Sequence, residues 1–555
     1  MSAKIERVVG LYNWHDAGYC VLEDGKLVEH IEIERYTRVK EDFGDSLKYF
    51  TEGYLKKNNL NLDDIDHWVS PCPHTNLAAG NDIVYDTHDH LPADKISFYS
   101  HHLCHASHAY FSSDLNDAYI LTLDSAGMED DGRPISSGAY YAQGNSIVKI
   151  FDVSNEEVSL GNLWGRFTRF VFKLSSGYPR GHQAGSVMAM AALGDPTKYA
   201  QEIFRAATTD FHHVRHMPPG YVRGRYVPPE EDVIHPYLQR WRTLAEESEQ
   251  EKFNIAAALQ AVTEHIIFLI IRDLIKQASD AGHTSKNICL AGGVSLNSVA
   301  TGKILDRFPQ LEQCFIPPVP YDAGLSIGAA QYHWNSVLKR ERSTDAVSPY
   351  LGEDYTYHDV EEALANSGVS EDLIKTDVDL DACVDLLIEQ KIVSIFCGRS
   401  ESGRRALGNR SILADPRSPD MKDLINQKVK HRQWYRPFAP TILEEYGDEW
   451  FDGFFPSPYM SFVFRFREDK QGHVPAVEHF NRTARLQSVS KTQNPYYYAL
   501  IDNFREKTGV PIILNTSFND REPICETPQH AIGCFLGTDI DYLYFPEHKI
   551  LVAKQ

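Results

Sequence analysis

Residues 8–33 read VVGLYNWHDAGYCVLEDGKLVEHIEI, and this stretch predicts how the fold begins. Val8–Tyr12 and Ala17–Leu22 are short apolar runs, and Leu27–Ile33 alternates apolar with polar residues, so we expect three strands. Asp24-Gly25 lies before the third run and favours a tight turn. The first forty residues therefore predict a β-meander with polar residues in its first turn.

The same arrangement recurs further along the chain. Ala118–Leu123 is an apolar run that leads into Asp124 and an acidic turn, so it predicts a buried strand with an acid at its carboxyl end. Two copies of strand, acid and turn favour two related sub-domains with a ligand cleft between them. Phe253–Ala278 has apolar residues on several faces and predicts a long, mostly buried helix.

A third apolar run, Asn287–Ala291, is followed by a glycine pair and a helix signal. In this pattern backbone N–H groups face a phosphate, so the segment predicts a phosphate cradle. Its candidate residues are Gly292, Gly293, Val294 and Asn297.

The second half of the chain carries a dense polar run at residues 398–440. Ten Lys and Arg side chains fall within it, although the whole protein has a formal net charge of −22. Arg offers a planar fork to phosphate or carboxylate, and Lys offers a point charge. The run therefore predicts a site for a phosphoanhydride or an acyl phosphate; the alternative is a solvated, salt-bridged surface.

Further polar residues in this half are expected to line the same pocket. Asn515, Ser517 and Asn519 alternate on an expected strand, so all three side chains would point to one face. Adenylyl transfer at an α-phosphate requires several cations, because the charge of the phosphates must be neutralised. The candidate cations are Arg405, Lys430, Arg436 and Arg485.

A His pair predicts a metal site. His101 and His105 lie four residues apart, which places both imidazoles on one face of a helix. Asp124 is a third candidate ligand, and Asp322, at an expected helix start, is a fourth. Two histidines with two carboxylates suit iron, manganese or zinc and leave open positions for a ligand. The alternative is a His pair of this spacing that binds nothing.

Two other polar groups have competing interpretations. The first consists of His15-Asp16, Glu34-Arg35, Arg38 and Lys40. It indicates either a second functional group or an ordinary strand end with ion pairs. The second consists of His212, His213 and His216, in a Pro-, Arg- and His-rich excursion at residues 208–250. We expect these three side chains to be solvated rather than metal-bound.

Length and charge limit the classes of protein. A chain of 555 residues is too long for one core, so at least two domains are expected. The polar, irregular span from Lys339 to Tyr357 predicts a boundary, which gives domains 1–345 and 346–555. The net charge of −22 counts against a general binder of nucleic acid or membrane surfaces.

Three features predict the location of the protein. No run approaches the roughly 18 apolar residues of a membrane helix, and the N-terminus has no signal-peptide core. The nine cysteines are scattered without a C-x-x-C pair, which favours reduced thiols. We therefore expect a cytoplasmic protein with no nucleic-acid and no membrane partner.

These motifs resemble those of the O-carbamoyltransferases, the family that acts on nodulation factors, cephems and tobramycin. The resemblance covers nearly the whole chain, and its most specific marker is the block Arg405–Arg417. The other markers are His15-Asp16, Glu34–Arg38, His101 and His105, Asp124, Gly292–Val294, Tyr321–Gly324, Arg436–Pro440 and Leu514–Asn519.

The resemblance implies a fold and a reaction. The fold class is α/β, with an actin/hexokinase-like N-terminal domain that binds metal and adenylate and a YrdC-like C-terminal domain. The C-terminal domain would combine carbamoyl phosphate with ATP, bound with Mg²⁺, to give carbamoyladenylate and pyrophosphate. The N-terminal domain would then transfer the carbamoyl group to a hydroxyl of a small secondary-metabolite acceptor, with Fe²⁺ as the expected metal and Mn or Zn as alternatives.

Residue roles follow from the same resemblance. The residues of adenylate formation would be Arg405, Lys430, Arg436, Arg485 and Ser517. The metal ligands would be His101, His105, Asp124 and Asp322. The residues that hold the nucleotide would be Gly292, Gly293, Val294, Asn297, Asn515 and Asn519. His15 and Lys40 would lie on the acceptor side, with His15 as general base.

Three alternatives stay open. A threonylcarbamoyl-type tRNA-modifying enzyme would use the same two modules, but the acidic charge counts against an RNA partner. An actin-like kinase or ATPase would leave the His pair and the Arg-rich half unexplained, and a non-catalytic ATP-binding protein would not need this set of side chains. The sequence names neither the acceptor nor the oligomeric state, although a homodimer is compatible with the resemblance.

Overall fold

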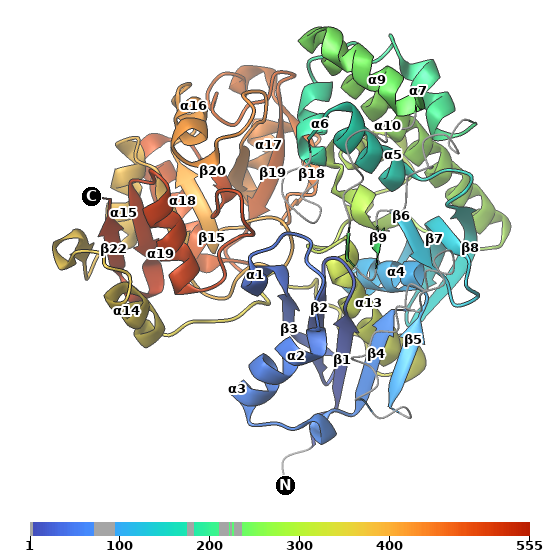
Figure 1. The fold of residues 1–555 in the computed structure, drawn as a ribbon, viewed down its shortest axis with the longest axis horizontal. Coiled ribbons are helices and arrows are strands. Elements are labelled where there is room, and N and C mark those ends of the chain that lie inside the picture. Colours follow the sequence, from blue (N-terminus) through green and yellow to red (C-terminus); the bar gives the residue numbers. More distant parts are fainter. Residues whose placement is uncertain are drawn as a thin grey trace. The chain divides into compact units, whose positions relative to one another are not determined.

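The computed structural model describes residues 4–71, 91, 95–174, 183–209, 221–222, 225–226 and 236–554. The chain forms two compact units, Met1–Val347 and Ser348–Gln555, and each is described by itself. The first unit runs from blue to yellow in Figure 1, and the second from yellow to red. His212, His213 and His216 lie outside the described residues.

The first sheet of the N-terminal unit consists of the predicted meander and two later strands. β1 (Arg7–Tyr12), β2 (Gly18–Glu23) and β3 (Lys26–Glu32) pair antiparallel, which confirms the three predicted strands. β4 (His67–Pro71) and β5 (Ile96–Tyr99) continue the sheet parallel to β1. The strand order is β3-β2-β1-β4-β5.

The second sheet of this unit repeats that topology. β6 (Asp117–Met128), β7 (Pro134–Gln143) and β8 (Ser146–Ser154) form an antiparallel meander. β11 (Asn287–Ala291) and β12 (Gln313–Phe315) continue it parallel to β6. The order β12-β11-β6-β7-β8 matches that of the first sheet. This agrees with the two related sub-domains that the sequence predicted.

One strand boundary was predicted wrongly. β6 does not end at Asp124: it continues to Met128, and its pairing with β7 shifts register between Leu123 and Gly127. An irregularity of this kind bends a strand and redirects its side chains. Asp124 therefore lies inside β6, at the irregular position, rather than in a turn after the strand.

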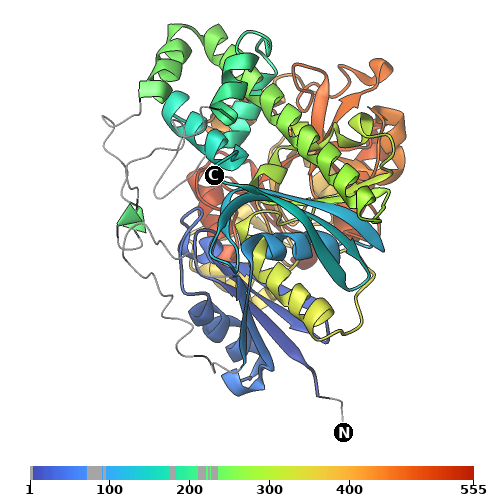
Figure 2. The ribbon, with the colours of Figure 1, turned by 90° about the vertical axis from the view of Figure 1, so that its right-hand side faces the viewer.

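Two helices lie between the sheets of the N-terminal unit. α4 (His101–Phe111) packs on β6, β7 and β11, while α13 (Leu325–Tyr332) packs on β1, β2 and β4 (Figure 2). The helices also pack on each other, and they approach closely because Gly328 has no side chain. A Cβ at this position would lie 1.8 Å from the carbonyl oxygen of Cys104. The layers therefore hold α4 and α13 in one fixed relation.

The remaining elements of this unit surround the two sheets. The helices are α1 (Glu34–Thr37), α2 (Ser46–Phe50), α3 (Lys56–Asn58), α5 (Leu160–Arg166), α6 (Ala184–Ala191), α7 (Ala200–Ala207), α9 (Pro236–Glu247), α10 (Glu249–Asp280), α11 (Ser298–Thr301) and α12 (Ile304–Arg307). The short strands β9 (Tyr221–Val222) and β10 (Arg225–Tyr226) pair with each other.

α10 contains the predicted helix Phe253–Ala278 and packs on α6, α7 and α9. Within the part of the chain that the structure describes, it is long and apolar enough to cross a membrane by length and composition. The expectation that no run approaches that length is therefore wrong. Of its most apolar window 72% is buried inside the unit, and a core helix of a globular domain passes the same test.

The C-terminal unit contains a ten-stranded sheet. In order across the sheet, its strands are β13 (Ile374–Lys375), β22 (Ile550–Ala553), β21 (Tyr542–Phe545), β14 (Val393–Phe396), β15 (Arg410–Ala414), β20 (Ile512–Ser517), β16 (Ala439–Leu443), β19 (Thr483–Val489), β18 (Phe462–Phe466) and β17 (Phe451–Asp452). The helices are α14 (Tyr357–Ala365), α15 (Leu380–Ile388), α16 (Met421–Ile425), α17 (Gly447–Trp450), α18 (Pro495–Thr508) and α19 (Pro528–Gly537).

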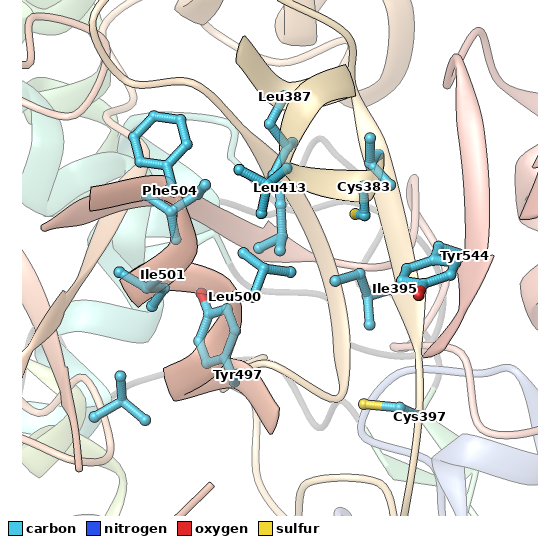
Figure 3. Packing of buried hydrophobic residues seen from close by; sticks show 14 of the residues in the cluster. Cys383, Leu387, Ile395, Cys397, Leu413, Tyr497, Leu500, Ile501, Phe504 and Tyr544 are labelled. Carbon is cyan, nitrogen blue, oxygen red and sulfur yellow. The ribbon is translucent and has the colours of Figure 1, made fainter. Parts of the chain in front are cut away.

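The core of this unit lies between the sheet and the helices α15 and α18. Leu413 of β15 and Ile513 of β20 belong to the same buried cluster as Leu387 of α15 and Leu500 and Phe504 of α18 (Figure 3). The cluster covers one face of the sheet, because residues two apart on a strand share a face. The residues that continue this face beyond the apolar cluster are polar, and they form part of the site described next.

Candidate metal centre and anion site

The four predicted metal ligands converge in the N-terminal unit. His101, His105, Asp124 and Asp322 each offer a ligand atom, and these atoms all lie within 4.8 Å of one another. His105 Nε2 lies 3.4 Å from Asp124 Oδ2 and 3.5 Å from Asp322 Oδ1. His101 Nε2 lies 3.9 Å from Asp322 Oδ1. The donor atoms thus surround a common centre at separations longer than ordinary hydrogen bonds.

Local packing sets the orientation of α4 at this centre. His102 is fully buried, and its ring bonds to Thr122 Oγ1 at 2.7 Å and to the Ile135 carbonyl oxygen at 3.0 Å. These contacts attach α4 to the second sheet, and burial lowers the pKa of His102 to about 3. Gly127 leaves room for His101, because a Cβ there would lie 2.2 Å from the His101 ring. His102 is therefore a packing residue, whereas His101 and His105 face the centre.

The charges at the centre suit a cation. His105 is buried, and neither ring nitrogen has a hydrogen-bond partner among the described residues. Burial alone would lower the pKa of His105, but Asp124 and Asp322 raise it to about 9. Burial and the charge of Asp124 raise the pKa of Asp322. A divalent metal would replace the proton between these groups, and the donor set fits iron, manganese or zinc.

His15 joins this centre from the first turn of the meander. Its Nε2 lies 3.4 Å from Asp322 Oδ2, and its Nδ1 lies 2.8 Å from Asp16 Oδ2. Tyr12, at the end of β1, donates its hydroxyl to Asp322 Oδ2 at 2.9 Å. Tyr12 was not predicted as a residue of this site, although its position at the carboxyl end of β1 could have indicated it. Lys40 lies in the loop after α1 and is half-buried.

The glycine loop after β11 connects the segments that carry the two carboxylates. Gly292 has a φ of 88°, and a Cβ there would lie 2.2 Å from the Leu123 carbonyl oxygen. Its N–H donates to the Pro320 carbonyl oxygen at 2.6 Å, and the Gly293 N–H donates to Asp124 Oδ2 at 2.8 Å. Both N–H groups are thus used within the protein, and that of Gly293 positions Asp124.

The other two residues of the expected phosphate cradle are also engaged. Asn297 caps α11 by accepting the Ala300 N–H at 3.2 Å, and it exchanges two side-chain hydrogen bonds with Gln260. Val294 is buried. Adenylate binding by this loop stays a prediction, and the structure itself shows a positioning role.

In the C-terminal unit, candidate residues lie on the core face of the sheet. Asn515 follows Ile513 on β20, and Ser517 follows Asn515, so all three share that face. On β19, Arg485 precedes Gln487 on the matching face. Along the strands, the side chains of this face are therefore first apolar and then polar, and Arg485 and Ser517 lie at its end.

Asn515 belongs to the polar layer of this face. It is 1% exposed, and its Nδ2 donates to the Ala406 carbonyl oxygen, Thr441 Oγ1 and Gln487 Oε1, each at 3.1 Å. These bonds hold the loop that follows Arg405 over the sheet. Asn515 thus helps to position the loop that follows Arg405.

Four arginines gather near the end of this face. Burial and the charges of Arg405, Arg436 and Arg432 lower the pKa of Arg485 well below its usual value. Burial and the charge of Arg436 lower the pKa of Arg432 well below its usual value, and burial lowers the pKa of Arg436. The Nε of Arg485 is buried and lacks a hydrogen-bond partner among the described residues. Mutual repulsion of this kind favours a bound anion, as the basic run predicted.

Lys430, Ser517 and Asn519 form a compact group beside β20. The Lys430 Nζ donates to the Ser517 carbonyl oxygen at 2.6 Å, to the Asn519 carbonyl oxygen at 2.6 Å and to Asn519 Oδ1 at 2.8 Å. Ser517 Oγ donates to Asn519 Oδ1 at 2.7 Å. Asn519 lies beyond the end of β20 at Ser517, so the predicted alternation of three residues on one strand is wrong for the third.

A buried carboxylate shapes the loop that carries Arg405. Glu401 is 1% exposed, and its Oε1 accepts the N–H groups of Leu407 at 2.7 Å, Asn409 at 2.7 Å and Arg410 at 3.2 Å. A carboxylate that accepts three backbone bonds fixes the local chain path. The sequence analysis missed Glu401, which lies within the basic run.

Glu401→Ala is expected to lower the free energy of unfolding of the C-terminal unit by about 2–4 kcal/mol, because three buried N–H groups lose their acceptor. Urea denaturation of the full chain would measure the loss. Glu401→Gln keeps an acceptor oxygen and should recover part of it, and the exposed Glu445→Ala is the matched control. Equal stability of Glu401→Ala and Glu445→Ala would contradict this role.

Comparisons with known proteins agree on one family. The model described as Carbamoyltransferase N-terminus matches residues 76–331, and Carbamoyltransferase C-terminus matches residues 384–553. Nodulation protein NolNO of Sinorhizobium fredii is 33% identical over 97% of this chain and 79% of its own length. Nodulation protein NolO of Bradyrhizobium diazoefficiens is 35% identical over 80% of this chain and 77% of its own length.

One solved structure shows a distant likeness to this chain. T. kodakarensis HypF is 14% identical with a TM-score of 0.36, and the match covers 62% of this chain and 50% of HypF. This likeness is too low to support a conclusion about this chain.

Proposed function

The chain belongs to the carbamoyltransferase family, and from this premise we propose that it is an ATP-dependent O-carbamoyltransferase with two reaction sites. We assign activation of the carbamoyl group to the C-terminal unit. We assign its transfer to a hydroxyl of a small-molecule acceptor to the N-terminal unit. Two steps are needed because carbamate is a poor electrophile, whereas its mixed anhydride with AMP has a good leaving group.

The arginine cluster is the observation that carries the activation step. Positive charge is concentrated around Arg485, whose pKa is lowered by burial and by its arginine neighbours. Bound phosphates would relieve this repulsion, and arginines stabilise the charge that develops on a transferred phosphoryl group. The YrdC-like C-terminal domain that the family resemblance implies would suit the same assignment.

The proposed activation consists of two reactions. Water cleaves carbamoyl phosphate to carbamate and inorganic phosphate. A carbamate oxygen then bonds to the α-phosphorus of ATP, and the bond from that phosphorus to the bridging oxygen breaks. The products are carbamoyladenylate and pyrophosphate, with Mg²⁺ as the expected counter-ion of the ATP phosphates.

For the transfer step, we assign the metal to His101, His105, Asp124 and Asp322, with Fe²⁺ as the expected ion. A divalent cation held there would polarise an acyl oxygen and neutralise phosphate charge. In the tautomer in which the Nδ1–H of His15 donates to Asp16, the Nε2 would carry the lone pair. That nitrogen would accept the proton of the acceptor hydroxyl as general base.

Other parts of the proposal rest on the resemblance and the sequence. Adenylate contacts of the loop Gly292–Asn297 and an acceptor-side role of Lys40 come from the family pattern. A cytoplasmic location follows from the expectation of reduced thiols.

The proposal is tested by ATP–pyrophosphate exchange with the purified full chain, with and without carbamoyl phosphate. We expect exchange only when carbamoyl phosphate is present, because carbamoyladenylate forms only from carbamate, and labelled pyrophosphate then attacks its α-phosphorus to regenerate ATP and release carbamate. Release of ADP without exchange would overturn the proposal and favour the kinase or ATPase alternative.

A further inference from the structure

A second group of side chains that could hold a metal lies in the C-terminal unit, beside the group formed by Lys430, Ser517 and Asn519. Glu522, Cys525 and Cys534 each offer a ligand atom, and these atoms lie within 4.8 Å of one another. Cys525 is 0% exposed and Cys534 is 9% exposed. The group combines two sulfur donors with one carboxylate, which is a donor set for a thiophilic cation.

The local fold holds this group together. The Cys525 N–H donates to the Phe518 carbonyl oxygen at 3.0 Å, and its thiol donates to the His530 carbonyl oxygen at 3.4 Å. Thr527 caps α19 by accepting the His530 N–H at 3.1 Å. The segment before α19 is therefore fixed against the first turns of the helix, and Cys534 on that helix faces Cys525.

The charges near the group also favour a cation. The hydrogen bond to Cys525, burial and the charge of Glu522 raise the pKa of the Cys534 thiol, and Lys430 acts in the opposite direction, so a bound cation has to displace the thiol proton. Two thiolates and one carboxylate carry three negative charges. A divalent cation and the ammonium of Lys430 carry three positive charges, so the loaded group would be neutral as a whole.

We propose that Glu522, Cys525 and Cys534 bind a divalent thiophilic cation, with Zn²⁺ as the class representative. Binding forms two metal–sulfur bonds and one metal–oxygen bond, and each thiol releases its proton to solvent. Three protein ligands leave a fourth position of the tetrahedron for water. This inference does not depend on the proposed carbamoyl transfer.

Such an ion would attach the segment after β20 to α19. Asn519 Nδ2 donates to the Glu522 carbonyl oxygen at 2.6 Å, and Asn519 Oδ1 accepts from Lys430 at 2.8 Å. The metal would therefore stabilise the group formed by Lys430, Ser517 and Asn519. It acts on that group as a positioning element and contacts no substrate.

The first test is X-ray absorption at the zinc edge on the wild-type full chain loaded with one equivalent of Zn²⁺. Sulfur neighbours at about 2.3 Å are expected, because the centre of His101 and Asp322 offers only nitrogen and oxygen. A spectrum with nitrogen and oxygen neighbours alone, at one and at two equivalents, would overturn the proposal.

The second test is a Co²⁺ titration of the double variant His101→Ala/His105→Ala, which lacks the imidazoles of the other centre. We expect a sulfur-to-cobalt charge-transfer band in the near ultraviolet that excess Zn²⁺ removes. Adding Cys525→Ser or Cys534→Ser should weaken the band, and Glu522→Gln should weaken Co²⁺ binding by roughly tenfold.

Cys383→Ala is the matched control for these variants. Cys383 is also fully buried in the C-terminal unit, but it belongs to the apolar core cluster, so its loss should leave the band unchanged. A band that survives both Cys525→Ser and Cys534→Ser would overturn the proposal. A thiol count that shows a disulfide bond between Cys525 and Cys534, in the protein purified without reductant, would also overturn the proposal.

Discussion

His101→Ala is expected to lower carbamoyl transfer to the acceptor by roughly a thousandfold or more, while ATP–pyrophosphate exchange continues at the wild-type rate. The imidazole belongs to the four-residue centre of the N-terminal unit, and its loss would weaken the hold on the proposed metal, which would supply several kcal/mol of charge stabilisation. In the proposed division, exchange would depend on residues of the C-terminal unit alone. The two activities are measured with the same protein preparation.

The control for this prediction is His265→Ala, an exposed histidine of α10 in the same unit. It should leave both activities and the metal content unchanged. Metal analysis should show less bound ion in His101→Ala than in His265→Ala. If His101→Ala stopped the exchange reaction in a folded protein, the division into two reaction sites would be wrong.

Arg485→Ala is expected to lower ATP–pyrophosphate exchange by roughly 10²–10³-fold, the usual effect of removing one preorganised donor from a charged transition state. Arg485 is surrounded by Arg405, Arg432 and Arg436, and its Nε is buried without a partner among the described residues. Transfer from chemically supplied carbamoyladenylate should be spared. Arg485→Lys should recover little, because an ammonium lacks the planar fork.

Arg465→Ala is the matched control for the arginine cluster. Arg465 is exposed on the neighbouring strand β18, where it lies opposite Thr483. Its loss should leave the exchange rate unchanged. Equal rates for Arg485→Ala and Arg465→Ala would show that the buried cluster does not act on ATP. The stability of Arg485→Ala should rise, since removal of one charge relieves repulsion among the others.

Much of the local structure was predictable because it depends on near neighbours. The strands β1 to β3, the strand β11 and the helix α10 follow from apolar periodicity and turn residues. The same patterns failed at Asp124, where β6 continues through an irregular pairing. That outcome depends on the partner strand β7, which lies outside the local pattern.

The candidate sites were predictable as residue types, and the roles of these residues toward substrate stay predictions. Lys430 was expected to act on substrate, and the structure shows that its ammonium holds two backbone carbonyl oxygens. Asn515 was expected to line a pocket, and it is buried in a polar layer of the sheet. The structural role of Glu401 was not predicted, because this residue is a single acid within a basic run. Such assignments depend on which buried group needs a partner, and only the packed chain decides that.

The sequence by itself determined the family, the three strands of the first meander and the His pair, because each is written in contiguous residues or in one helical turn. The sequence named Asp322 as a candidate ligand, and the tertiary structure places its carboxylate beside His105, more than 200 residues earlier in the chain. The tertiary structure also decided that Arg485 joins Arg405, and that Cys534 faces Cys525 and Glu522. The physical reason is that side chains distant in sequence meet only when sheets and helices pack, and packing is a property of the whole unit.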